Sequence, residues 1–347
     1  MTRRAASVEE LPPPPPETLS QKLTYWQYRA VWAAAAHLPD VLYWRTPERV
    51  GSAWHAAASE RQRSQVRANL RRVLPEGTSE RELATIARQA YAQYARYWLD
   101  AFHLHRWGQD EVLGRSSGEG LEHVDAFRAN DRGGIVATGH LGAWDVGAFF
   151  TTSRDWRLTV VAEVLEPRRL FERFVQLRRD AGLGVIPLVS GGDMIDRLAA
   201  AVEDGGVATL LADRDLTKKG PVVEFFGEPC RLPPGVAALA RRTGRPFAAG
   251  AFLALPHGWR AIVRPAVDIA HLSVEQGTQV VAWELERLIE RDPSQWHVFV
   301  RNWLADREPD HEAVAAWRAG RWDPPLSDRE QWSPPWPDGV FDVRAAD

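Results

Sequence analysis

The sequence predicts an α/β fold: a mostly parallel central sheet flanked by helices, preceded by a helical N-terminal layer. Three observations support this. The 347 residues are 45% apolar and 26% charged, as in a folded chain with a sizeable core. Residues 18–106 carry apolar side chains at three- and four-residue spacing, which indicates helices. After Gly118, short β-rich apolar runs alternate with helical segments, which is typical of βαβ units.

The N-terminal part divides into a tail and a helical layer. Five consecutive prolines at 12–16 cannot pack into a helix or sheet, so we expect residues 1–17 to be a disordered tail. Residues 18–112 form the expected helical layer, in which Ser79 and Glu82 indicate a capping box. Its first helix, "LSQKLTYWQYRAVWAAAAHL", is rich in aromatic residues. This composition suits a helix in a membrane interface or one packed on the α/β body, and both remain open.

The α/β core is expected over residues 113–306. Its strands are predicted at "GIVATG", "LTVVAEV", "VIPLV", "VATLLAD", "RPFAAGAFLAL" and "WRAIVRP". Helices are predicted at "PRRLFERFVQLRRDAG", "GGDMIDRLAAAVEDG" and "VEQGTQVVAWELERLIER", and another opens after the prolines at 233–234. Residues 307–347 are rich in Pro, Asp and Trp, and we expect an extended tail there.

Composition argues against several classes of protein. A net charge of −3 gives no basic footprint, so nucleic acid is not an expected partner. The single cysteine, Cys230, excludes an intrachain disulfide and a thiolate metal cluster, which fits a reducing compartment. The longest early apolar run, residues 30–36, is too short to span a bilayer, and no secretory leader pattern opens the chain.

The stretch "GGIVATGHLGAWDVGAFF", residues 133–150, places His140 between an expected strand and an expected helix. The pattern H-x4-[DE], which joins His140 to Asp145, also occurs at His55–Glu60 and His105–Asp110, so spacing alone is weak evidence. Only His140 follows a buried strand and precedes a helix, where catalytic groups collect in open α/β sheets. Context therefore selects His140.

The partner expected for His140 is Asp145, about one turn inside the following helix. From there its carboxylate could reach one ring nitrogen and leave the other free to take a proton. A structural His–Asp hydrogen bond is the competing interpretation. A metal site is less favoured, because no second histidine or third ligand accompanies the pair.

Two further clusters carry charge. In "LLADRDLTKKGPVVEFFGEPCRLPPG", Asp213 and Asp215 end a predicted strand on the same edge, with Arg214 and Arg231 nearby. The acids could assist His140 or pair with these arginines, and "EFFG" could wall an acyl site or form a core turn. In "PRRLFERFVQLRRDAG", a row of arginines that includes Arg178 could be a solvated face or a phosphate clamp.

Five blocks in order resemble the bacterial lipid A biosynthesis acyltransferase family, over roughly residues 20–305. They are "VRANLRRVLP", "GIVATGHLGAWD", "VAEVLEPRRLFERFVQLRRDAGLGVIPL", the block from "LLADRD" to "ARRTG", and "DPSQWHVFVRNW". The likeness is greatest to the phosphatidylinositol mannoside branch. It implies a glycerolphosphate-acyltransferase-like fold and association with the cytoplasmic face of the cell membrane.

The resemblance also implies an activity. The expected reaction moves a fatty acyl group from acyl-CoA, with palmitoyl-CoA as the expected donor, to a sugar hydroxyl of a phosphatidylinositol mannoside-type glycolipid, with mannose as the acylated sugar. No cofactor is expected beyond that donor substrate. The family's signature histidine and acid correspond to His140 and Asp145, and a functional arginine to Arg178. Glu163 matches a position close to the site. An acid of the mannoside branch falls at Asp213 or Asp215, and the register leaves both open.

The sequence thus predicts His140 as general base in a direct transfer, with Asp145, Asp213 and Asp215 as further catalytic candidates. Glu163, Arg178, Arg214 and Arg231 are the predicted substrate-binding residues. Backbone N–H groups at 141–142, or a nearby arginine, would stabilise the oxyanion. The alternatives are a lipid A-type, other glycolipid or lysophospholipid O-acyltransferase, a non-catalytic lipid-binding protein, and a metal-dependent phosphoesterase using the acids of the "DRD" block.

Overall fold

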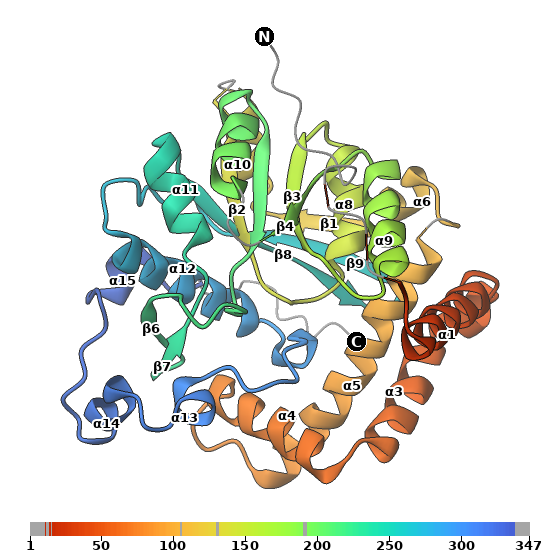
Figure 1. Cartoon of the computed structure of the whole chain (residues 1–347), viewed down its shortest axis with the longest axis horizontal. Coiled ribbons are helices and arrows are strands. Elements are labelled where there is room, and N and C mark those ends of the chain that lie inside the picture. Colours follow the sequence, from red (N-terminus) through yellow and green to blue (C-terminus); the bar gives the residue numbers. More distant parts are fainter. Residues whose placement is uncertain are drawn as a thin grey trace.

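A seven-stranded sheet forms the centre of the protein (Figure 1), in the order β1-β9-β8-β2-β5-β3-β4. The computed structural model describes residues 11, 14, 16–104, 106–129, 132–189 and 193–336. The strands are β1 (Ser116–Glu119), β2 (Gly134–Thr138), β3 (Leu158–Glu163), β4 (Gly184–Leu188), β5 (Val207–Leu211), β8 (Phe247–Leu255) and β9 (Gly258–Val263). All neighbours pair in parallel except β8 and β9, which confirms the predicted mostly parallel sheet.

Helices cover both faces of this sheet. They are α7 (Glu122–Ala129), α8 (Trp144–Thr152), α9 (Arg168–Asp180), α10 (Met194–Glu203), α11 (Gly235–Thr243) and α12 (Val274–Ile289). Because side chains alternate along a strand, Ile135 and Ala137 of β2 join the core cluster that contains α11 and α12. Val136 joins a cluster on the other face, and Thr138 points the same way beneath α8.

The N-terminal layer is helical, as predicted. It comprises α1 (Leu19–Ala36), α2 (Asp40–Tyr43), α3 (Thr46–Ala57), α4 (Glu60–Val73), α5 (Glu80–His103) and α6 (Gln109–Gly114). The side chain of Ser79 caps α5 by accepting a hydrogen bond from the N–H of Glu82. The ring of Trp32 in α1 contacts Phe102 and Phe174, so one side of this helix packs on the body. Among the described residues, no helix is long and apolar enough to cross a membrane.

A small antiparallel hairpin, β6 (Val222–Phe225) and β7 (Glu228–Arg231), lies outside the main sheet. It contains the "EFFG" stretch. Phe225 is fully buried and its ring stacks on Trp303. The stretch is therefore a core turn and not the wall of an acyl site.

The segment after Arg307 is partly helical, which corrects the expectation of an extended tail. It holds α14 (Glu312–Arg318) and α15 (Arg329–Trp332), after the short α13 (Leu304–Arg307). Trp336 donates its indole N–H to the carbonyl of Arg287 in α12 at 2.8 Å, so this segment packs on the core. Residues 337–347, and most of the predicted N-terminal tail, lie outside the described residues.

Candidate active site

The loop that carries His140 joins the end of β2 to the start of α8. Gly142 in this loop has φ +67°, a conformation that glycine adopts at little cost. A Cβ at this position would lie 2.2 Å from the carbonyl oxygen of Phe252. Both the backbone conformation and the close approach to β8 therefore require glycine here.

A distant segment, residues 295–297, crosses this loop and holds it. Gly142 donates its N–H to the carbonyl of Gln295 at 3.0 Å, and His297 donates its N–H to the carbonyl of His140 at 2.7 Å. The loop is thereby fixed in an antiparallel bridge with the 295–297 segment. Because the N–H of Gly142 is already bonded, it cannot serve as the expected oxyanion donor.

His140 pairs with Asp213 and not with Asp145. Its Nδ1 lies 2.8 Å from Oδ1 of Asp213, and its backbone N–H donates to Oδ2 at 2.8 Å. Asp213 is fully buried and also accepts from the indole N–H of Trp296 at 2.8 Å. Burial alone would raise the pKa of Asp213, but the charge of His140 and these hydrogen bonds outweigh it, so this pKa lies below its ordinary value.

This pairing determines which ring nitrogen of His140 is available. Because a carboxylate only accepts hydrogen bonds, Nδ1 carries the proton toward Asp213. Nε2 has no hydrogen-bond partner among the described residues, and the side chain is 27% exposed. In the neutral form of the ring, Nε2 is then the nitrogen without a proton, and it can accept one from a hydroxyl that approaches from solvent.

Asp145 belongs to a separate buried cluster. It lies in the first turn of α8 and accepts from Nε of Arg178 at 2.9 Å and from the hydroxyl of Tyr97 at 3.0 Å. Burial and the charge of Asp145 raise the pKa of Tyr97 well above its ordinary value. The first turn of α8 thus directs this carboxylate toward α5 and α9, which corrects the prediction that it orients His140.

The other predicted residues have different surroundings. The carboxylate of Asp215 accepts hydrogen bonds from the N–H groups of Thr217 and Gly220, so it stabilises the loop of residues 215–220. Arg231 bonds Glu308 and the carbonyl of Gly220, which gives it structural partners. Arg214 follows Asp213 directly and is half-buried. Glu163 is the exposed last residue of β3.

Several residues of the site were missed at the level of sequence. Trp296 and Asn302 both bind Asp213, the second by donating to its carbonyl at 3.0 Å. His297 stacks on Tyr94 with ring centroids 4.9 Å apart. Burial lowers the pKa of His297 to about 3, so this side chain is neutral. The sequence signal that could have indicated these residues is the set of polar side chains in the otherwise apolar "QWHVFVRNW" stretch.

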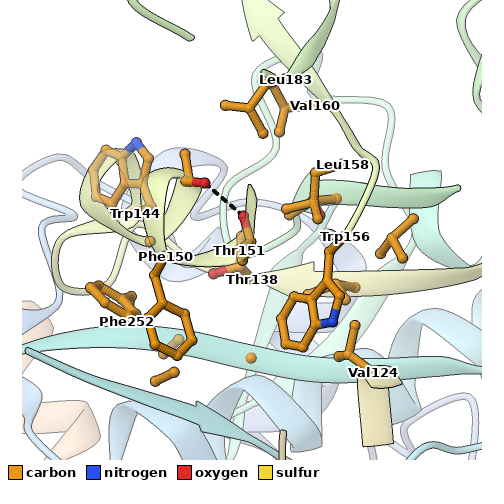
Figure 2. Close-up of a pocket in the computed structure, with 18 of the residues that line it drawn as sticks. Val124, Thr138, Trp144, Phe150, Thr151, Trp156, Leu158, Val160, Leu183 and Phe252 are labelled. Atoms are coloured by element: carbon orange, nitrogen blue, oxygen red, sulfur yellow. Dashed lines mark hydrogen bonds between the residues drawn. The ribbon is translucent and has the colours of Figure 1, made fainter. Parts of the chain in front are cut away.

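An apolar cavity of about 140 Å³ lies between α8 and the sheet (Figure 2). Trp144, Asp145 and Arg178 line it near the His140 loop, and Phe150 and Phe252 line it on the same side as Trp144 in Figure 2. Figure 2 shows Trp156 on the far side of Thr138 and Thr151 from Trp144. Its other lining residues are mainly aliphatic and come from α7, α8, Leu183 and the strands β2, β3, β5, β8 and β9. The cavity suits a linear hydrocarbon.

Comparison with known proteins identifies the family. The model of the bacterial lipid A biosynthesis acyltransferase family matches residues 16–305. This chain belongs to that family. It is 34% identical over 315 residues to the phosphatidylinositol mannoside acyltransferase of Mycobacterium tuberculosis, covering 88% of this chain and 96% of the relative. It is 30% identical over 297 residues to the protein of the same name from Mycolicibacterium smegmatis, covering 85% of this chain and 96% of the relative.

Membership in the lipid A biosynthesis acyltransferase family establishes the class of enzyme. The match covers both the helical layer and the α/β core, so it includes every residue of the site described above. The chain is therefore an acyltransferase. Among the described residues, no group of three or more His, Cys, Asp or Glu side chains could hold a metal ion.

Proposed function

We propose that this acyltransferase moves a fatty acyl group from acyl-CoA to a sugar hydroxyl, that of a mannose, in a phosphatidylinositol mannoside-type glycolipid. The observation that carries the proposal is the His140–Asp213 pair, which leaves Nε2 without a hydrogen-bond partner among the described residues. The ring of His140 lies 5.8 Å from that of Trp144, which lines the apolar cavity. The names of the curated relatives support this acceptor.

In the proposed mechanism His140 is the general base. Nε2 removes the proton of the acceptor hydroxyl while the oxygen attacks the thioester carbonyl. The C–S bond then breaks, an ester forms, and the imidazolium gives its proton to the leaving thiolate. Asp213 holds the ring by Nδ1 at 2.8 Å and stabilises the imidazolium. Such proton transfer contributes on the order of 10²–10⁴-fold to a rate. The step needs no metal and no cofactor.

Arg178 supplies the proposed oxyanion contact. Its Nε and Nη2 face Asp145, whereas Nη1 has no hydrogen-bond partner among the described residues. The side chain lines the apolar cavity beside Trp144 and Asp145. A guanidinium held by a buried carboxylate is a pre-oriented donor for charge that develops on the carbonyl oxygen.

The apolar cavity is the proposed acyl site. Fatty chains gain about 0.8 kcal/mol for each methylene group removed from water, so a deep apolar cavity selects them strongly. The thioester would then lie at the Trp144 end, next to the His140 loop, and the methyl end of the chain would point toward Trp156.

The proposed location is the cytoplasmic face of the cell membrane, with α1 at its surface. Leu19, Leu23, Trp26 and Val31 of this helix are exposed, and Val41 in α2 is 77% exposed. Lys22 and Arg29 lie on the same helix. Exposed apolar and basic side chains together are typical of a helix that lies in the interface plane.

The test uses radiolabelled palmitoyl-CoA with a phosphatidylinositol mannoside, a lipid A precursor and a lysophospholipid as parallel acceptors. We expect label in the mannoside only, with no effect of a metal chelator, and loss of transfer in His140→Ala. The matched control is His271→Ala, an exposed histidine outside the site. Label in one of the other two acceptors would show that this acceptor, and not the mannoside, is the substrate. Transfer retained by His140→Ala would overturn the mechanism, and no transfer by the wild type would favour a lipid-binding protein.

A further inference from the structure

We propose that a second cavity, lined by four arginines, binds the phosphate groups of a substrate while the reacting group of that substrate, the thioester carbonyl or the sugar hydroxyl, lies at His140. This inference rests on the proposed function, because it assigns the polar part of one of the two proposed substrates. The arginines are Arg61, Arg214, Arg301 and Arg307, here called the arginine cavity.

The arginine cavity is assembled from distant parts of the chain. Arg61 comes from the start of α4, Arg214 from the loop after β5, and Arg307 from the end of α13. The volume is about 430 Å³, enough for a phosphorylated group. Figure 1 shows α4 and α13 close to each other, and α1 on the other side of α5.

The residues that line this cavity carry an excess of positive charge, because four arginines face one carboxylate, that of Asp215. Among the residues that the structure describes, none of the four arginines forms an ion pair, and Arg61 and Arg214 have no hydrogen-bond partner either. Arg301 and Arg307 donate only to the backbone carbonyls of Asp306 and Asp215, at 3.2 and 3.0 Å. Convergent arginines without acidic partners are suited to bind phosphate oxygens bidentately.

The one acid that lines the cavity, Asp215, interacts with the charge of Arg307, which helps to lower the pKa of this carboxyl, but its oxygens are hydrogen-bonded within its own loop. The carboxylate of Asp215 accepts hydrogen bonds from the N–H of Thr217 at 2.8 Å, the hydroxyl of Thr217 at 2.7 Å and the N–H of Gly220 at 3.0 Å. It therefore shapes the loop that presents Arg214. The guanidinium groups stay available to an incoming anion.

The arginine cavity lies beside the His140 loop. Arg214 directly follows Asp213, the partner of His140. Phe299, which also lines the cavity, packs against Tyr94 with ring centroids 5.1 Å apart, and Tyr94 stacks on His297. His297 in turn bonds the backbone of His140. Because Arg214 is adjacent to Asp213 in the chain, the proposal places the polar group of a substrate in this cavity while its reacting group lies at His140.

Phosphate is present in both proposed substrates, and two experiments distinguish the sources. The donor carries a pyrophosphate and a 3′-phosphate in its coenzyme A part. The acceptor carries a phosphodiester in its phosphoinositol headgroup. We compare the wild type with Arg61→Gln/Arg301→Gln, which removes two exposed arginines that contact no carboxylate among the described residues.

The first experiment measures affinity without catalysis. Titration calorimetry on the full chain uses coenzyme A, dephospho-coenzyme A that lacks the 3′-phosphate, and a deacylated phosphoinositol mannoside headgroup. The double variant should bind one of the two ligands, coenzyme A or the deacylated headgroup, about tenfold more weakly than the wild type does. Its affinity for that ligand should also depend less steeply on salt concentration. If coenzyme A is that source, loss of its 3′-phosphate should weaken binding to the wild type more than to the variant.

The second experiment measures the KM of each substrate in acyl transfer. In the double variant, the KM of the substrate that contains the weakened ligand should be about tenfold higher than in the wild type, with little change in kcat. Arg81→Gln/Arg318→Gln, which removes two exposed arginines outside the cavity, is the matched control and should behave as the wild type. If the double variant has the same affinities and KM values as the control, the proposal that the arginine cavity binds phosphate groups is wrong. Failure of acyl transfer in the wild type would instead count against the proposed function, because the calorimetric result is independent of it.

Discussion

Two buried carboxylates lie close to the His140 loop, and they have opposite partners. Asp213 is fully buried and faces the imidazole of His140, the indole of Trp296 and a backbone N–H. Asp145 is 3% exposed and faces the guanidinium of Arg178 and the hydroxyl of Tyr97. The first carboxylate holds an imidazole, whereas the second holds a guanidinium.

The difference shows that neighbouring strands, and not spacing along the chain, select the partner of His140. In the sheet β2 pairs with β5, with Thr138 opposite Leu211. The N–H of Ala212 continues this ladder by donating to the carbonyl of Thr138 at 2.8 Å. Two residues beyond each strand end, His140 and Asp213 therefore meet. Four predictions test the comparison and the site around it.

Replacing Asp213 should have the largest effect. Asp213→Asn loses one of the two oxygens that receive the ring and backbone N–H groups of His140, and it no longer stabilises an imidazolium. We expect kcat to fall on the order of 10²–10⁴-fold. Initial rates at saturating substrate measure this, with thermal unfolding as the check on folding. A kcat within a few-fold of wild type would mean that His140 needs no carboxylate partner.

Replacing Asp145 should cost less activity and more stability. Asp145→Asn leaves the guanidinium of Arg178, whose side chain is 20% exposed, with a neutral partner. We therefore expect destabilisation below the range of about 3–5 kcal/mol for a fully buried pair, and a kcat about 10–100-fold lower. Urea unfolding and steady-state rates measure the two effects. In Asp145→Asn/Arg178→Gln the two stability losses should be less than additive. A rate loss equal to that of Asp213→Asn would contradict the separation of the two carboxylates.

Trp156 should limit acyl length. It lines the apolar cavity and also a polar cavity of about 500 Å³ near Arg128 and Arg157, and its indole N–H bonds Asp125 at 2.8 Å. Trp156→Leu should open the first cavity into the second and shift preference toward longer acyl-CoA chains, by about fourfold per methylene. Competition between donors of different length measures this. Trp317→Leu is the control, and an unchanged preference would exclude Trp156 as the end wall.

The smallest effect concerns stability at acid pH. Burial lowers the pKa of His297 to about 3, below its ordinary value of 6.5. The unfolded chain therefore binds more protons, and stability should fall as pH decreases from 6.5 toward 3, by at most roughly 1.4 kcal/mol per pH unit. In His297→Gln this slope should be smaller, and in His271→Gln unchanged. Equal slopes in all three proteins would show that His297 titrates normally.

The strands that could be predicted from sequence are those with continuous apolar runs. Parallel strands covered on both faces need such runs, and β2, β3, β4, β5, β8 and β9 all have them. β1, with the sequence "SSGE", was missed because it is an edge strand held through backbone pairing with β9. The hairpin of β6 and β7 was missed for a related reason, because its core role depends on packing against Trp303.

The candidate site was predictable only in part. The strand-to-helix position and the flanking glycines indicated His140 without any structure. The choice between Asp145 and Asp213 could not be made, because it depends on β5 lying beside β2 in the sheet. Trp296 and His297 lie in a stretch whose polar residues were a signal, but nothing local to His140 indicates that this distant segment crosses its loop.

The crossing of the His140 loop by residues 295–297 has a consequence for biosynthesis. His297 and Gly142, which share a hydrogen bond, are 155 residues apart in the chain. The ribosome releases β2, β5 and Asp213 long before it releases this segment. A nascent chain can therefore pair its strands and still lack an ordered His140 loop. This loop should become ordered only after residues 295–297 have left the ribosome, when most of the apolar cavity has formed.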